Sequence, residues 1–435
     1  MINCDLIIKN ISQLITPVLN NNSGNQIENT LVKNCHGGAY LKIISPAEVG
    51  IKKGKIVYAG SPWDNLQVKN EGKIIDARGL IALPAFVDPH THLIFSGYRA
   101  EEFHLRLQGT TYLEILRRGG GILSTVKKVR DSSFEELYQD SKNHLLTLVE
   151  NGTTTIEVKS GYGLDLENEV KMLEVTRALN NEGIARFIPT FMGLHAVPSE
   201  YQGKTREYVE YMTDEVLPII AEKKLAHFVD VFVEKGVFSP EEALPFLEKS
   251  LKLGFKIRLH ADEFSDIGAI PLACRVGAVT AEHLLTTSDA SLLAMAKNKV
   301  MAILLPGTIF SLGLEGFPFF NRFQKAGLKV ALGTDFNPGT SMTESMEFII
   351  SLAVTRLKMP LEDAIVASTL HGATSLGLED ITGSLETGKS ADLIFLNLPN
   401  YQHLGYRQGI SHVKAVFFAG KLVSTGYTKL GKYNF

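Results

Sequence analysis

The 435-residue chain is poor in cysteine, with Cys4, Cys35 and Cys274 as its three thiols. Their number is odd and no pair has CxxC spacing, which argues against a disulfide framework or a cysteine-based zinc site and favours a reducing, cytoplasmic compartment. No apolar run approaches the ~20 residues that a membrane-spanning helix needs. The N-terminus also lacks the basic-then-apolar pattern of a signal peptide, so no membrane partner is expected.

The chain has no concentrated charge of one sign. It carries 44 Lys and Arg residues against 47 Asp and Glu residues, for a formal net charge of −3. Its densest basic run is Lys127-Lys128-Val129-Arg130. Because nucleic-acid-binding domains usually present a dense basic face, we expect no nucleic-acid partner.

Strand-like segments at both chain ends flank a region in which apolar strands alternate with amphipathic helices. This alternation predicts an α/β protein built on a closed parallel (β/α)₈, TIM-like barrel. We place the barrel at 80–372 and a small composite β-sandwich domain at 1–79 and 373–435, formed by both ends. The eight predicted barrel strands are residues 80–88, 153–159, 186–191, 228–233, 256–259, 278–281, 300–305 and 329–333.

Polar residues with metal-binding side chains lie at the ends of four of these strands. His90 and His92 follow the first strand, and residues i and i+2 of an extended segment point to the same side. A lone His-x-His is a weak signal, but His260, His283 and Asp335 also come directly after apolar strands. Barrel enzymes carry their active sites at the C-terminal strand ends, so the pattern predicts a metal site, and its histidine and carboxylate ligands suit Zn or Fe.

Glu263 lies three residues after His260. A carboxylate in this place could take a proton from a water activated by the metal and return it to a leaving nitrogen. The alternative interpretation is an ordinary loop residue that forms a surface salt bridge.

Several longer motifs carry a resemblance to a known family. Nearly the whole chain resembles the amidohydrolase superfamily of metal-dependent hydrolases, and within it the branch that opens the imidazolone ring. The His-x-His motif and the late Asp are typical of the superfamily, whereas 119–125, 159–164 and 337–340 are typical of the branch. The motifs are residues 86–92, 106–112, 119–125, 157–164, 193–198, 260–263 and 334–340.

This resemblance implies a reaction and a set of residue roles. The ring C–N bond of 4-imidazolone-5-propanoate would be hydrolysed to N-formimidoyl-L-glutamate, a step of histidine degradation. One Zn²⁺ or Fe³⁺ per subunit would be bound by His90, His92, His260 and Asp335. Catalysis would use Glu263, His283 and Asp335. The small-molecule substrate or product would contact Arg99, Tyr162, His195, Glu263, Asn337, Gly339 and Thr340.

Individual substrate-binding residues also have plainer interpretations. Arg99 suits a propionate because a guanidinium binds a carboxylate in a fork, but it could instead pair with a neighbouring Glu. Tyr162 could be a packed loop aromatic, and His195 a loop histidine with ordinary hydrogen bonds. The Asn337–Gly339 stretch could be a simple β-turn.

Two rival functions stay open at the level of sequence. A heterocycle deaminase would use the same metal and acid–base residues, but it would release ammonia. A catalytically inactive scaffold would bind no metal. Lys159 ends a strand, where some amidohydrolases carry a carboxylated lysine that bridges two metals, but the resemblance favours one metal and a supporting role for Lys159. The polar insertion at 20–36 has no assigned function, and the exposed barrel helices leave a homodimer as an open option.

Overall fold

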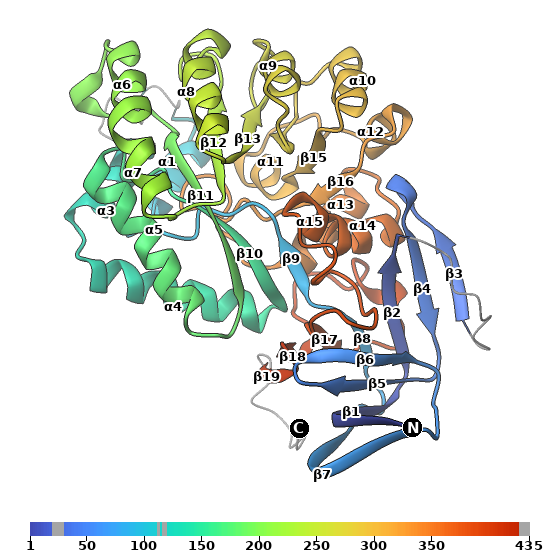
Figure 1. Ribbon diagram of the computed structural model, residues 1–435. Coiled ribbons are helices and arrows are strands. Elements are labelled where there is room, and N and C mark those ends of the chain that lie inside the picture. Colours follow the sequence, from blue (N-terminus) through green and yellow to red (C-terminus); the bar gives the residue numbers. More distant parts are fainter. Residues whose placement is uncertain (20–29, 111–113, 115–119, 426–435) are drawn as a thin grey trace.

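The computed structural model describes residues 1–19, 30–110, 114 and 120–425, with the side chains of 69–71 left out. Most of the polar insertion (20–29) and Gly119 of the glycine-rich motif lie outside the described residues. Figure 1 shows a barrel wrapped by helices and, below it, a β-rich unit to which both ends of the chain contribute.

The barrel consists of eight parallel strands that neighbour one another in chain order, from β9 to β16. The ring is nearly closed, and a single parallel bridge between Thr91 and Phe336 joins its two edges. The predicted TIM-like barrel is therefore confirmed. Its strands are β9 (Phe86–Asp88), β10 (Thr153–Lys159), β11 (Arg186–Leu194), β12 (Phe228–Val233), β13 (Lys256–Ala261), β14 (Thr280–His283), β15 (Met301–Leu304) and β16 (Val330–Leu332).

The prediction of one continuous strand at 80–88 is wrong. The segment forms two strands, β8 (Ile81–Pro84) and β9, separated at Ala85. Pro84 has no N–H to donate to a ladder, which favours a strand end at this position. Ala85 N then donates to Asp392 O and Phe86 N to Gly152 O, so the chain leaves one sheet and enters the barrel within two residues.

The β-rich unit is a sandwich of two sheets, as predicted. The four-stranded sheet has the order β6-β5-β1-β7, and the seven-stranded sheet has the order β19-β18-β17-β8-β2-β4-β3. Buried side chains from both chain ends, such as Ile8, Leu14, Phe395 and Phe417, share one core. The division into domains at 79/80 and 372/373 stays a prediction. The strands are β1 (Ile2–Ile11), β2 (Gln13–Val18), β3 (Thr30–Asn34), β4 (Tyr40–Ile44), β5 (Ala47–Lys52), β6 (Lys55–Gly60), β7 (Leu66–Asp76), β17 (Leu393–Leu396), β18 (Val413–Phe418) and β19 (Lys421–Ser424).

Helices on the outside of the barrel connect its strands (Figure 1). One of them begins as its sequence indicates: Ser239 Oγ accepts from Glu242 N at 3.2 Å, and Glu242 Oε2 accepts from Ser239 N at 2.8 Å. Within the described residues, no helix combines the length and apolar character needed to cross a membrane. The main helices are α1 (Ala100–Leu107), α3 (Ile122–Asp131), α4 (Phe134–Glu150), α5 (Leu166–Asn180), α6 (Thr205–Tyr211), α7 (Leu217–Glu222), α8 (Pro240–Lys252), α9 (Ala269–Val276), α10 (Asp289–Lys297), α11 (Pro306–Leu312), α12 (Phe320–Ala326), α13 (Met346–Thr355), α14 (Leu361–Ala367) and α15 (Leu370–Ser375).

Candidate active site

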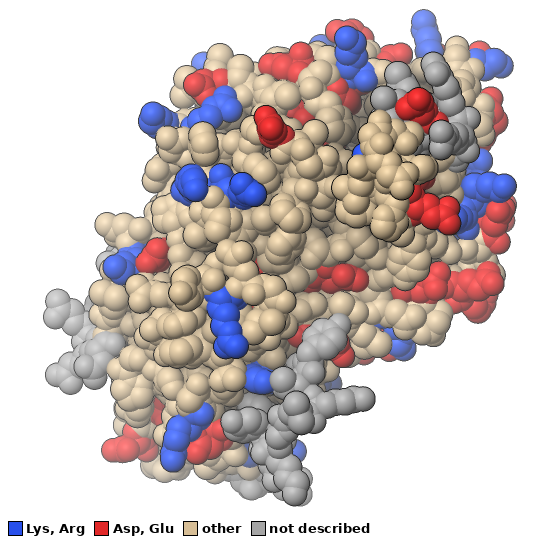
Figure 2. All heavy atoms as spheres, turned by 180° about the vertical axis from the view of Figure 1, so that it is seen from behind, with Lys and Arg blue, Asp and Glu red and all other residues tan. Residues whose placement is uncertain are grey.

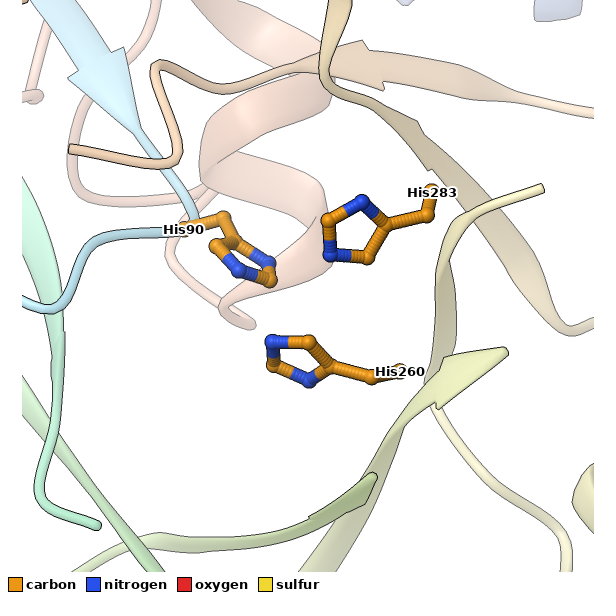
Figure 3. Close-up of side chains that lie close together, drawn as sticks. All are labelled: His90, His260 and His283. Carbon is orange, nitrogen blue, oxygen red and sulfur yellow. The ribbon is translucent and has the colours of Figure 1, made fainter. Parts of the chain in front are cut away.

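Side chains from separate strand ends converge at the C-terminal mouth of the barrel. Figure 3 shows the imidazoles of His90, His260 and His283 turned toward a common point, from the end of β9, from β13 and from β14. The ring centroids of His90 and His260 lie 4.6 Å apart, and those of His260 and His283 lie 5.1 Å apart. One nitrogen from each of the three rings lies within 4.8 Å of the others.

Asp335 and His92 join the same cluster through His90. Asp335 Oδ1 lies 3.3 Å from His90 Nε2 and 3.6 Å from His92 Nε2. The backbone fixes this arrangement, because Asp335 N donates to His90 O and His92 N donates to Phe336 O. The four residues predicted as metal ligands therefore lie together. The ring centroids of His283 and His90 lie 5.5 Å apart, close to the 5.4 Å between His92 and His90, so proximity alone does not separate His283 from the predicted ligands.

The donor atoms at this point fit a cation. His90 Nε2 and His260 Nε2 are buried, and neither has a hydrogen-bond partner among the described residues. Buried polar atoms normally have partners. Burial and the Lys159 charge lower the pKa of His90, but the nearby carboxylates of Glu282 and Asp335 outweigh both and raise it to about 9. The carboxylates thus attract positive charge to this pocket, and imidazole nitrogens are ligands that suit a transition metal.

Asp335 is well suited to remain an anion here. Burial pushes its pKa upward, but contacts from His90, the nearby His283 and the hydroxyl of Thr308 bring the pKa to about 2. Thr308 Oγ1 donates directly to Asp335 Oδ2. Sequence reasoning missed Thr308, because a threonine two residues into a short helix carries no distinctive signal.

Glu263 and His283 face each other across the site. Glu263 Oε2 lies 3.6 Å from His283 Nε2, and both side chains are buried. Burial, together with the charges of Asp335 and Glu234, raises the pKa of Glu263 well above its ordinary value. Burial also lowers the pKa of His283 to about 3. A carboxyl group that readily holds a proton beside a neutral imidazole is an arrangement that can move protons.

A cavity of about 450 Å³ opens above the histidine cluster. The other predicted substrate residues meet there, except that Gly339 lies just behind the wall. Burial raises the pKa of Tyr162, so its phenol stays protonated, whereas burial and the nearby His260 lower the pKa of His195 to about 3. The lining includes His92, Arg99, Arg106, Tyr162, His195, Phe232, Glu263, His283, Asp335, Asn337 and Thr340.

Arg99 and the loop after β16 form the far wall of this cavity. Arg99 Nε donates to Glu102 Oε2 at 2.9 Å, so the local pairing considered from the sequence does occur. A Cβ on Gly339 would collide with the Arg99 guanidinium, so a larger residue there would force Arg99 to move. Asn337 Oδ1 accepts from Gly339 N and Thr340 N, each at 2.8 Å, so the stretch is a turn that shapes the wall.

Arg106 belongs to one of the motifs of the resemblance, but no role in the site was predicted for it from the sequence. It lines the cavity from α1, and its Nη1 and Nη2 each donate to Gly339 O at 3.2 Å. Helix α1, which contains Arg106 and has Arg99 as its N-cap residue, is thereby attached to the loop after β16. Spacing could have drawn attention to Arg106, because it lies seven residues after Arg99, on the same side of a helix.

Two site residues have left-handed backbone conformations. His283 has φ of 73° and Asp335 has φ of 52°. Non-glycine residues rarely adopt such angles, and they cluster at functional sites, where the surrounding structure holds them in place.

Comparisons with known proteins agree with this geometry. Models described as "Amidohydrolase family" match residues 73–158 and 269–423. An imidazolonepropionase from Clostridium tetani is 43% identical over 96% of this chain and 98% of its own length. One from Alkaliphilus metalliredigens is 42% identical over the same shares of both chains.

Solved structures with low sequence identity share the fold. An adenosine deaminase from Xanthomonas campestris with bound zinc has a TM-score of 0.68 at 18% identity, covering 99% of this chain and 95% of that one. A 5-methylcytosine deaminase from Klebsiella pneumoniae has a TM-score of 0.70 at 16% identity, covering 98% of this chain and all of that one. At these identities the likeness concerns the fold alone.

The barrel and its histidine–aspartate mouth define an amidohydrolase, a hydrolase that acts on C–N bonds. Three polar residues of the cavity lining, Tyr162, Asn337 and Thr340, come from motifs typical of the ring-opening branch. The chain belongs to the imidazolonepropionase family.

Proposed function

We propose that this protein hydrolyses the ring C–N bond of 4-imidazolone-5-propanoate and releases N-formimidoyl-L-glutamate. One observation carries the proposal: a single cavity has a histidine–aspartate cluster at its floor and a guanidinium in its wall. The substrate needs both, since a cyclic amide must be activated at one end and a propionate bound at the other. The names of the full-length relatives support the same substrate.

His90, His92, His260 and Asp335 would hold one Zn²⁺ or Fe³⁺ per subunit. When bound, such an ion polarises a carbonyl oxygen and lowers the pKa of water from about 16 toward about 7. Three imidazoles and one carboxylate are acceptable ligands for either metal.

Glu263 would transfer the proton in the reaction. Its carboxylate accepts a proton from the attacking water, whose oxygen bonds to the ring carbonyl carbon. As the C–N bond breaks, Glu263 gives this proton to the ring nitrogen, so the net change is the addition of one water. A nearby cation favours the carboxylate form needed at the start, while burial favours the protonated form needed later. His283 would donate a hydrogen bond to the developing oxyanion.

The cavity wall would orient the substrate for this attack. Arg99 would bind the propionate, with Tyr162, His195 and Thr340 completing the contacts. Asn337 and Gly339 would contact the opened product. Accurate positioning matters because small displacements of a reacting group can cost on the order of a hundredfold in rate.

The setting of the enzyme completes the proposal. We infer that it works in the cytoplasm, where its free thiols would stay reduced. We also infer a homodimer, in which exposed barrel helices of two copies would meet. On the face shown in Figure 2, acidic and basic side chains are scattered among uncharged ones.

The test is to add freshly made imidazolone propionate to protein whose metal content has been measured, and to follow the ultraviolet absorbance. Faster decay than the spontaneous rate, without ammonia, is expected. Ammonia release would indicate deaminase chemistry instead. Decay at the spontaneous rate by metal-loaded protein would reject the substrate, and the absence of bound metal would favour an inactive scaffold.

A further inference from the structure

Five ionisable side chains are completely buried beneath the proposed metal site, and none of them takes part in the steps above. We call them the charge cluster: Glu157, Lys159, Asp230, Arg258 and Glu282. They come from four strands of the barrel, β10, β12, β13 and β14. An isolated charge in such a place would be very costly, so a function for the cluster must be sought in how its members are paired.

Lys159 lies at the centre of the charge cluster. Its Nζ is 2.7 Å from Asp230 Oδ2, 2.9 Å from Glu157 Oε1 and 3.1 Å from Glu282 Oε2. Arg258 completes the set, with Nη2 2.7 Å from Glu282 Oε1. The same Nη2 donates to Pro89 O at 2.7 Å, at the residue before His90.

Two of the carboxylates held by Lys159 also contact metal-site imidazoles. Asp230 Oδ2 lies 3.0 Å from His260 Nδ1, and its Oδ1 accepts from His260 N at 3.1 Å. Glu282 Oε2 contacts His90 Nδ1. A histidine that donates its Nδ1–H to a carboxylate keeps its lone pair on Nε2, the nitrogen that then binds metal.

We propose that Lys159 is a positioning residue that holds Asp230 and Glu282 so that His90 and His260 present Nε2 to a metal ion. One ammonium thereby fixes the ring orientation of two ligands from different strands. The same contacts distinguish Lys159 from a carboxylated, metal-bridging lysine, because a carbamate would bring a further negative charge to three carboxylates. The inference rests on the proposed metal-dependent function.

The test compares Co²⁺ binding by the full-length wild type with that of Lys159→Met and Lys159→Arg. Affinity is measured by competition with a chelator, and the geometry of the site by the visible absorption spectrum of bound Co²⁺. The matched control is Lys171→Met on α5, whose Nζ donates to backbone carbonyls outside the charge cluster. Lys159→Met should bind Co²⁺ about 10- to 100-fold more weakly and with an altered spectrum. Lys159→Arg should recover most of the affinity, and Lys171→Met should match the wild type.

Folded Lys159→Met with wild-type affinity and spectrum would overturn the inference. If circular dichroism shows that Lys159→Met does not fold, Glu157→Gln takes its place, since it removes one charge from around Lys159 with little change of shape. That variant should weaken Co²⁺ binding several-fold, and unchanged binding would again overturn the inference. A wild type that binds no Co²⁺ would instead reject the proposed function itself, so the two failures are distinguishable.

Discussion

Replacing Arg99 by Met should weaken substrate binding without affecting the metal. Arg99 Nε donates a hydrogen bond to Glu102 Oε2 at 2.9 Å. Among the described residues, Arg99 Nη1 and Nη2 make no hydrogen bond. Glu102 is itself held by Gly121 N and Ser124 Oγ, so the guanidinium is fixed with two donors available. Methionine keeps the apolar stem but removes the donors and the charge.

The size of the effect follows from these contacts. A hydrogen bond to a charged group contributes about 1.5–3 kcal/mol, and each 1.4 kcal/mol is a factor of ten in binding. If the Arg99→Met change costs the equivalent of one such hydrogen bond to the propionate, KM should rise by about 10- to 150-fold. The value of kcat should change much less, because the proposed role of Arg99 is to bind the propionate and not the reacting carbonyl.

A neutral methyl ester of the substrate provides the decisive comparison. The wild type should lose about as much affinity for the ester as Arg99→Met loses for the acid, and the variant should hardly distinguish the two compounds. Initial rates come from the ultraviolet assay, and metal content is measured for each sample. Arg206→Met, on the exposed surface of α6, serves as the control. Two results would show that Arg99 does not bind the propionate. One is an unchanged KM of Arg99→Met for the acid, and the other is an equal loss of affinity for the ester, relative to the acid, in the wild type and the variant.

Four further outcomes are expected. Glu263→Gln should lower kcat by about 10²- to 10⁴-fold with little change in bound metal, and an unaffected kcat would exclude Glu263 as the proton carrier. Removal of metal by a chelator should lower the unfolding temperature, since a ligand at 100 times its Kd stabilises by about 2.7 kcal/mol, and readdition should restore it. Ser239→Ala should cost about 1 kcal/mol of stability in urea unfolding by loss of the α8 cap. Burial raises the pKa of Asp88 to about 7. The contribution of Asp88 to stability is therefore fully present below about pH 4 and is lost as the pH rises through 7. Asp88→Asn should flatten the dependence of the free energy of unfolding on pH in this range.

The barrel and the side chains that meet at its mouth were predictable because both leave periodic or positional signals. Apolar strands alternate with helices, and polar residues at strand ends stand out against the apolar runs before them. The break within 80–88 was missed because an apolar run does not reveal which sheet each residue joins. Pro84 was the available clue, since it cannot donate to a central ladder.

The charge cluster was the main omission. Glu157, Asp230 and Arg258 were read as parts of strands, although an ionisable residue inside a buried strand requires a partner. The sequence shows that such partners are needed, but it does not identify them, because the partners come from other strands. Lys159 received attention only through the resemblance, and its three carboxylate contacts depend on the register of the sheet.

That register ties the fold to the site. In the pairing of β12 with β13, Asp230 lies opposite Arg258, and in the pairing of β13 with β14, His260 lies opposite Glu282. Side chains alternate between the two faces of a strand, so a slip of one residue would move each of these groups from the barrel interior to the outside. The apolar residues between them, such as Leu259 and Ala281, would move from the outside of the barrel to its interior. The packing of the barrel wall and the orientation of the imidazoles therefore favour the same register. A variant that disturbs the packing of these strands should also disturb the orientation of the imidazoles.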